Sequence, residues 1–75
     1  MKIFINSPLM SDKIIALLNG YKENGIEFRF VKKLGIKLEF EVSGIEPQEA
    51  CTLAKNLIKN TEFGKVLYFN VEAGK

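Results

Sequence analysis

The chain has 75 residues, enough for one small domain that hides only about 60 to 65% of its unfolded surface. Eleven lysines and arginines against nine aspartates and glutamates give a net charge of +2, well below the basic excess typical of domains that bind nucleic acid through phosphates. The absence of histidine excludes histidine-based triads and histidine metal sites, and a single cysteine, Cys51, excludes an internal disulfide.

The first predicted element is a short apolar strand over Lys2–Ile5, which the turn-forming residues "NSP" bring to an end. Apolar residues at steps of three and four then predict a helix, with Ser7 or Ser11 as its N-cap and Asn24-Gly25 as its end. The apolar stripe of this helix consists of Met10, Ile14, Leu17, Leu18 and Tyr21.

Two alternating runs, 26–31 and 36–42, predict a β-hairpin around the lysine pair. A three-residue loop over 33–35 keeps the apolar residues on one face and pairs Phe30 with Leu38. The same register places Arg29 opposite Glu39 as a cross-strand ion pair. The alternative is one long bent strand in a swapped dimer.

The second half of the chain predicts one helix and one strand. The helix begins at Pro47, and its apolar residues recur at helical spacing: Ala50, Leu53, Ala54, Leu57 and Ile58. The strand is "KVLYFNV", residues 65–71, with Leu67, Phe69 and Val71 on one side.

The order of these elements predicts an α+β fold, a ferredoxin-like βαββαβ plait that occupies residues 1–75 as a single domain. Its four-stranded antiparallel sheet has the order 4-1-3-2, and both helices lie on one face. The predicted core consists of Ile3, Ile5, Phe28, Phe30, Leu38, Phe40, Leu67 and Phe69 from the sheet, facing Leu17, Leu18, Leu53 and Leu57 from the helices.

The sheet face away from the helices is the first candidate site. The predicted strand order places Phe4 beside Tyr68 on this face, and the hairpin adds Arg29 and Val31. The fold resembles that of RNA recognition motifs, which stack bases on such aromatic side chains, but "IKLEFEV" lacks the glycine and the outward aromatics of that motif. A module that binds RNA or single-stranded DNA is therefore the alternative function, and a contact between two subunits would cover the same face.

One edge of the sheet is the second candidate site, because the plait brings the first strand's exit, the lysine turn and the last strand's entry together. The N-terminus of the first helix offers free N–H groups and a positive dipole end there. The residues predicted to bind an anion or an acidic partner are Asn6, Ser7, Ser11, Lys32, Lys33 and Lys65. The opposite edge collects Glu23, Glu27, Glu41, Glu46 and Glu72. The competing interpretation is that the lysines only solvate a turn.

The chain is similar in length and strand order to ACT domains, regulatory modules that bind small ligands. The first loop of those domains carries an acidic residue and a Pro-Gly pair, whereas "NSPLMSDKII" has only the proline. The resemblance implies small-ligand sensing across a dimer and assigns no individual residue.

The sequence predicts a non-enzymatic interaction or regulatory module that forms a homodimer and binds a small anionic molecule or an acidic protein. No catalytic residue, cofactor or metal site is predicted, because Cys51 lies in a helix without an adjacent basic cluster and Glu39 with Glu41 fit a solvated strand face. A small enzyme acting on a phosphorylated or acyl substrate is the third class; the fold resembles that of acylphosphatases, but "INSPLMS" lacks their arginine-bearing, glycine-rich loop. "MKIFINSPLM" has too short an apolar run for a signal peptide or membrane span, which favours a cytoplasmic protein without membrane contact.

Overall fold

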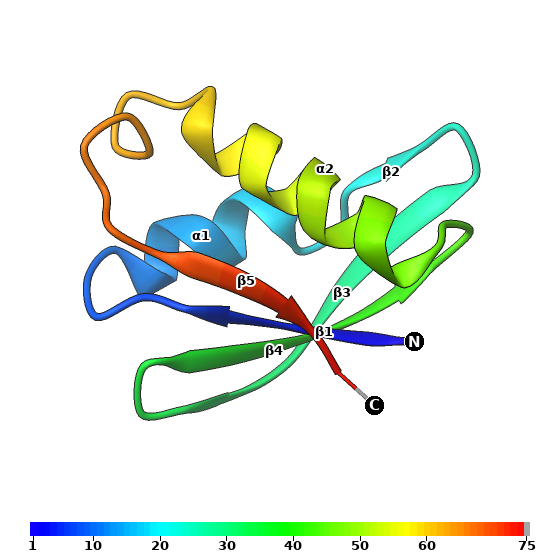
Figure 1. Cartoon of the computed structure of the whole chain (residues 1–75), viewed down its shortest axis with the longest axis horizontal. Coiled ribbons are helices and arrows are strands. Elements are labelled where there is room, and N and C mark those ends of the chain that lie inside the picture. The colour runs from blue at the N-terminus through cyan, green and yellow to red at the C-terminus, as the bar shows by residue number, and fades with distance from the viewer. Residues whose placement is uncertain (75) are drawn as a thin grey trace.

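Five strands form one antiparallel sheet, and two helices cover one of its faces (Figure 1). The computed structural model describes residues 1–74. The elements in chain order are β1 (Lys2–Asn6), α1 (Ser11–Leu18), β2 (Lys22–Glu23), β3 (Ile26–Leu34), β4 (Lys37–Ser43), α2 (Pro47–Lys59) and β5 (Asn70–Ala73). The strand order is β2-β3-β4-β1-β5, so the α+β class is confirmed. The strand count and the numbered order differ from the predicted four-stranded sheet of order 4-1-3-2, because β2 is added at one edge; the four predicted strands, here β1, β3, β4 and β5, have the predicted neighbours.

Helix α1 is shorter than predicted, because the chain leaves it at the first of two Asn-Gly pairs. The helix ends at Leu18, and Gly20 then takes a left-handed φ of 88°. Asn24 and Gly25, with φ of 55° and 78°, form the turn between β2 and β3 instead of ending the helix. A two-residue turn of type I′ needs positive φ at both positions, which Asn-Gly supplies. The unpredicted fifth strand, β2, is the product of this turn.

Strands β3 and β4 form the predicted hairpin with a shorter turn. Leu34 pairs with Lys37, so the turn consists of Gly35 and Ile36 rather than of residues 33–35. Gly35 has a φ of 61°, which glycine adopts without the strain that a Cβ would bring. Because the two strands pair with each other, the alternative of one long strand is wrong.

A β-bulge at Val31 shifts the register of this hairpin by one residue. Before the bulge, Arg29 faces Glu41, so the predicted pair of Arg29 with Glu39 is wrong. After the bulge, Lys33 pairs with the buried Leu38 and therefore lies on the face that carries the helices.

The second half of the chain follows the prediction in its helix and departs from it in its strand. Helix α2 covers Pro47–Lys59, with proline in its first turn as predicted. Strand β5 begins only at Asn70, which pairs with Asn6, the last residue of β1. Residues 66–69 have no strand beside them, because the chain turns away beyond Asn6 and Pro8 has no amide hydrogen.

The core lies between the helices and the sheet. Its fully buried apolar side chains are Ile3, Ile5, Ile14, Leu18, Phe28, Leu38, Phe40, Val42, Ala50, Ala54 and Ile58. Six residues predicted in the core are only half-buried at its margin: Leu17, Phe30, Leu53, Leu57, Leu67 and Phe69. Helix α2 turns two alanines towards the sheet, and small side chains let its backbone lie close, so its leucines point to the flanks.

Candidate functional site

Exposed apolar side chains gather where the β1–α1 loop meets the β3–β4 turn. Leu9 and Met10 are 65% and 45% exposed, and Leu34 and Ile36 are 61% and 53% exposed. Residues at loop and turn positions are usually polar, glycine or proline, so four large apolar side chains here are unusual. We call the surface formed by Leu9, Met10, Lys32, Lys33, Leu34 and Ile36 the hairpin end.

Two hydrogen bonds hold the loop and the turn together. The amide of Ser7 donates to the carbonyl oxygen of Ile36 at 2.9 Å. The Lys33 ammonium group donates to Ser11 Oγ at 3.1 Å, which the bulge at Val31 makes possible by placing Lys33 on the helix side. The β1–α1 loop, the β3–β4 turn and Lys33 therefore lie together at one end of the sheet, where Lys32 is presented on the other face.

The predicted anion site does not form as one cluster. Only Ser11 and Lys33 come together; Ser7 is 2% exposed and its hydroxyl donates to the carbonyl oxygen of Leu9 at 2.6 Å. Neither serine caps α1, whose N-cap is Met10, with a left-handed φ of 64° and no side-chain cap. Asp12 in the first turn adds negative charge where the anion was expected.

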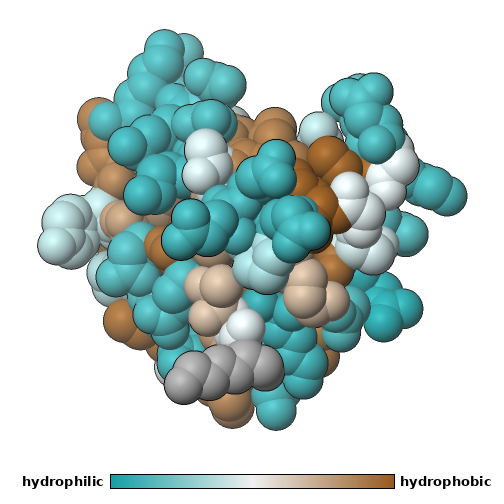
Figure 2. Space-filling model, turned by 45° about the vertical axis from the view of Figure 1, so that its right-hand side comes forward, coloured by the Kyte–Doolittle hydropathy of each residue, from teal (hydrophilic) through white to brown (hydrophobic). Residues whose placement is uncertain are grey.

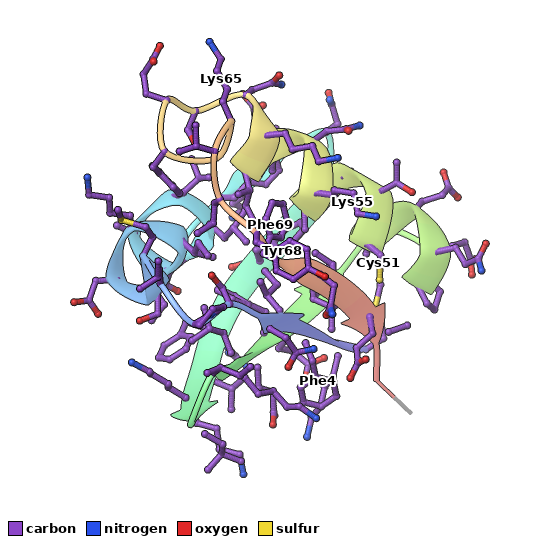
Figure 3. The ribbon with its side chains drawn as sticks, turned by 60° about the vertical axis from the view of Figure 1, so that its left-hand side comes forward. Phe4, Cys51, Lys55, Lys65, Tyr68 and Phe69 are labelled. Atoms are coloured by element: carbon purple, nitrogen blue, oxygen red, sulfur yellow. The ribbon has the colours of Figure 1, made fainter. Side chains whose placement is uncertain are left out.

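The other three predicted anion ligands lie elsewhere. The side-chain amide Nδ2 of Asn6 donates to Asn70 Oδ1 at 2.8 Å, between β1 and β5. Lys32 lies opposite Glu39, on the face away from the helices. Lys65 approaches Glu62 at 3.7 Å, and Figure 3 shows it at the opposite side of the molecule from the tip of β3.

The open face of the sheet is charged. Glu39 is only 7% exposed there, and its carboxylate meets the Lys2 ammonium group at 3.2 Å. The ammonium group of Lys37 lies 5.0 Å from the centre of the Phe4 ring and 3.8 Å from Glu72. The Phe4 ring, which the alternative function would use to stack a base, thus already makes a cation–π contact with Lys37.

The remaining residues predicted on the open face do not assemble around Phe4. Tyr68 is 88% exposed and lies before β5 begins, so the predicted neighbourhood of Phe4 and Tyr68 is wrong; Figure 3 shows the two well apart. Arg29 is exposed on β3 opposite Glu41, and Val31 is the bulged residue.

A groove of about 450 Å³ opens at the other end of the molecule, between α2 and the β2–β3 hairpin (Figure 2). Its apolar lining consists of Ile26, Ile45 and Leu53. Its polar lining comes from α2: Gln48, Glu49, Thr52 and Asn56. Gly44 brings the β4–α2 loop against the β2–β3 turn, since a Cβ there would lie 2.0 Å from the carbonyl oxygen of Gly25.

Two side chains, Tyr21 after α1 and Cys51 on α2, have raised pKa values. Tyr21, predicted in the first helix, instead packs edge-on against Phe28 at 5.6 Å, and burial together with nearby Glu23 raises the pKa of its hydroxyl. Burial also raises the pKa of the Cys51 thiol, and the Lys55 charge opposes this only in part. A thiol with a raised pKa is a poor nucleophile at neutral pH.

Sequence reasoning missed the surface of the hairpin end and the groove. The hairpin end could have been found from the large apolar residues inside two turn segments, "SPLMS" and "KKLGIK". Ile45 in the loop "SGIEP" was the only comparable signal for the groove.

None of the helices in residues 1–74 has the length and apolar character needed to cross a membrane. The same residues contain no group of three or more cysteine, aspartate and glutamate side chains arranged to hold a metal ion. Comparisons with protein-family models, curated proteins and solved structures find no match to this chain.

Proposed function

We propose that the protein is a non-enzymatic interaction module whose hairpin end binds an acidic and partly apolar protein surface. The observation that carries this proposal is the group of four exposed apolar side chains beside Lys32 and Lys33. Covering Leu34 and Ile36, each about half exposed, contributes about 1 kcal/mol per residue, and the lysines select an acidic partner.

The fold supports such a role. We infer that it is a ferredoxin-like plait with an added edge strand, because β3, β4, β1 and β5 are successive neighbours and α1 and α2 follow β1 and β4 in the chain. In this arrangement the hairpin end is carried by three sheet strands and a helix terminus, so its side chains are presented on a rigid support.

Nucleic-acid binding through the open face is less well supported. That face carries Glu39, Glu41 and Glu72, whose carboxylates repel phosphates, and the ring of Phe4 already has a lysine over it. Binding of an anionic small molecule at Ser11 and Lys33 is also less well supported, because the carboxylate of Asp12 beside them repels it.

The test is an NMR titration with a synthetic peptide of alternating glutamate and leucine. We expect salt-sensitive shifts confined to residues 9–12 and 32–37. Ile36→Ser raises the Kd about fivefold, since the loss of about 1 kcal/mol corresponds to that ratio. Val66→Ser is the matched control, because Val66 is 89% exposed and lies outside the hairpin end.

Two outcomes would contradict the proposal. A peptide of alternating lysine and leucine that binds equally well would show that charge does not select the partner. Shifts spread over the open face, or produced only by a single-stranded oligonucleotide, would favour nucleic-acid binding instead.

A further inference from the structure

The groove, like the hairpin end, combines apolar side chains with charged ones, but its charged side chains are carboxylates. Its apolar side chains are Ile26, Ile45 and Leu53, and its charged lining residue is Glu49. Glu23 pairs with Ile26 across the β2–β3 hairpin, so its side chain lies on the same face, beside the groove. Glu46, at the N-cap of α2, adds a third exposed carboxylate next to Ile45.

The charges of the two surfaces are opposite. Within residues 1–74 the groove is lined by no basic side chain, whereas the hairpin end offers Lys32 and Lys33 beside Leu34 and Ile36. Complementary charges steer association, and the exposed apolar side chains of the hairpin end can cover the half-buried ones of the groove. The volume of about 450 Å³ lies within the range of about 300–1,000 Å³ typical of sites that enclose small ligands, which is room for apolar side chains of a hairpin tip.

The two surfaces also lie at opposite ends of the fold (Figure 1). The β3–β4 turn and the β1–α1 loop are at one end of the sheet, and the β2–β3 turn with the start of α2 is at the other. The hairpin end of one chain therefore cannot reach its own groove, but it can enter the groove of a second copy.

We propose that the partner of the hairpin end is the groove of a second copy of this chain, so that copies associate head to tail. This rests on the function proposed above and names its partner. Such a contact is heterologous: each copy uses one surface as donor and another as acceptor, and association continues into a ring or a filament. It replaces the two-fold homodimer predicted from the sequence.

The test uses one variant for each surface. Leu34→Glu breaks the hairpin end, and the new carboxylate faces Lys37 across the turn, so the fold is retained. Glu49→Lys breaks the groove at an exposed position of α2. Glu62→Lys is the control with the same charge change, on a side chain that is 96% exposed and belongs to neither surface.

Sedimentation velocity up to about 1 mM, a concentration suited to weak association, distinguishes the outcomes. We expect wild type and Glu62→Lys to grow beyond dimers with concentration. Leu34→Glu and Glu49→Lys alone each weaken association at least about tenfold, whereas their mixture forms a heterodimer that grows no further, because each partner retains one intact surface.

The proposal is overturned by a wild-type monomer at that concentration, by a two-fold dimer that neither variant affects, or by a mixture that stays monomeric. If one of these occurs while the acidic peptide still shifts residues 9–12 and 32–37, the hairpin end binds a different protein. If the peptide also fails to bind, the proposed function fails as well.

Discussion

The carboxylate of Glu41 accepts a hydrogen bond from the Met1 ammonium group at 2.7 Å. This bond, helped by the charges of Lys2 and Arg29, lowers the pKa of Glu41 below its usual 4.5, against the opposing effect of burial. A carboxyl group whose pKa is lower in the folded chain stabilises the fold above its unfolded pKa. That stabilisation is lost as pH falls from about 4.5 through the folded pKa.

Glu41→Gln is therefore expected to lower the melting temperature at neutral pH and to leave it unchanged in strong acid. The difference between wild type and variant should shrink as pH falls below 4.5. Melting curves at several pH values measure this, and Glu62→Gln is the control, since Glu62 has no contact with the ammonium group. A difference that is constant with pH would contradict the linkage.

One residue, Val31, decides which lysine reaches the helix layer. If the ladder had continued without the bulge, Lys33 would have faced Lys37 on the open sheet face, and two like charges opposite each other are destabilising. The bulge moves Lys33 to the helix side, where it bonds to Ser11. A period-two pattern carries no sign of one inserted residue, so the sequence could not predict this contact.

Two loop glycines, Gly35 and Gly44, share a left-handed backbone, but only Gly44 lies against another segment of the chain. Gly35 and Gly44 both have positive φ, but nothing lies within 4 Å of a Cβ at Gly35, whereas a Cβ at Gly44 would meet the Gly25 carbonyl oxygen at 2.0 Å. We expect Gly35→Ala to lower the free energy of unfolding by about 1 kcal/mol. Gly44→Ala adds the displacement of the β2–β3 turn and should cost about 3 kcal/mol or more.

Urea unfolding of the two variants measures this difference. For a domain whose total stability is of the order of 5 kcal/mol, Gly44→Ala should remove more than half of it and lower the urea midpoint in proportion. Similar losses for both variants would mean that the close approach of the β4–α2 loop to the turn does not determine the cost.

Elements with one strong signal were predictable and those with two competing signals were not. Helix α2 has proline at its start and a clear apolar period, and its existence and its start were predicted. The segment "LLNGYKENG" has two Asn-Gly pairs, either of which can end a helix or form a turn. The choice depends on whether residues 20–23 find a partner in β3, which is a tertiary contact.

At the scale of the whole molecule, topology made one neighbourhood predictable, that of the lysine turn and the start of the first helix. The predicted order correctly placed the lysine turn and the first helix terminus together, as the bond from Lys33 to Ser11 shows. The exposure of Leu34 and Ile36 was not predicted, because Leu34 belonged to the predicted turn and Ile36 to the apolar pattern of the following strand. Only the packed structure shows that the core is already filled without them.

The molecule should exchange its amide hydrogens in an order set by the sheet. Strands β1 and β4 are paired on both sides and carry Ile3, Ile5, Leu38 and Phe40 in the core. Their amides should be protected at least about a hundredfold more than those of residues 66–69. Within residues 1–74, the latter amides donate no backbone hydrogen bond, because β5 begins only at Asn70.

Hydrogen exchange followed by NMR tests this order directly. The alternating side chains of residues 65–71 favour a strand, whereas the end of β1 at Asn6 leaves its first part unpaired. The half-buried Leu67 and Phe69 side chains pack on the core in either arrangement, so burial cannot decide between them. Backbone amides can: the amide of Gly74 donates to the carbonyl oxygen of Lys2, so within β5 the even-numbered residues turn their amides towards β1. Fast exchange at Val66 and Tyr68 beside slow exchange at Glu72 places the start of pairing at Asn70. Equal protection of all three would mean that β5 extends as far as the sequence pattern indicates.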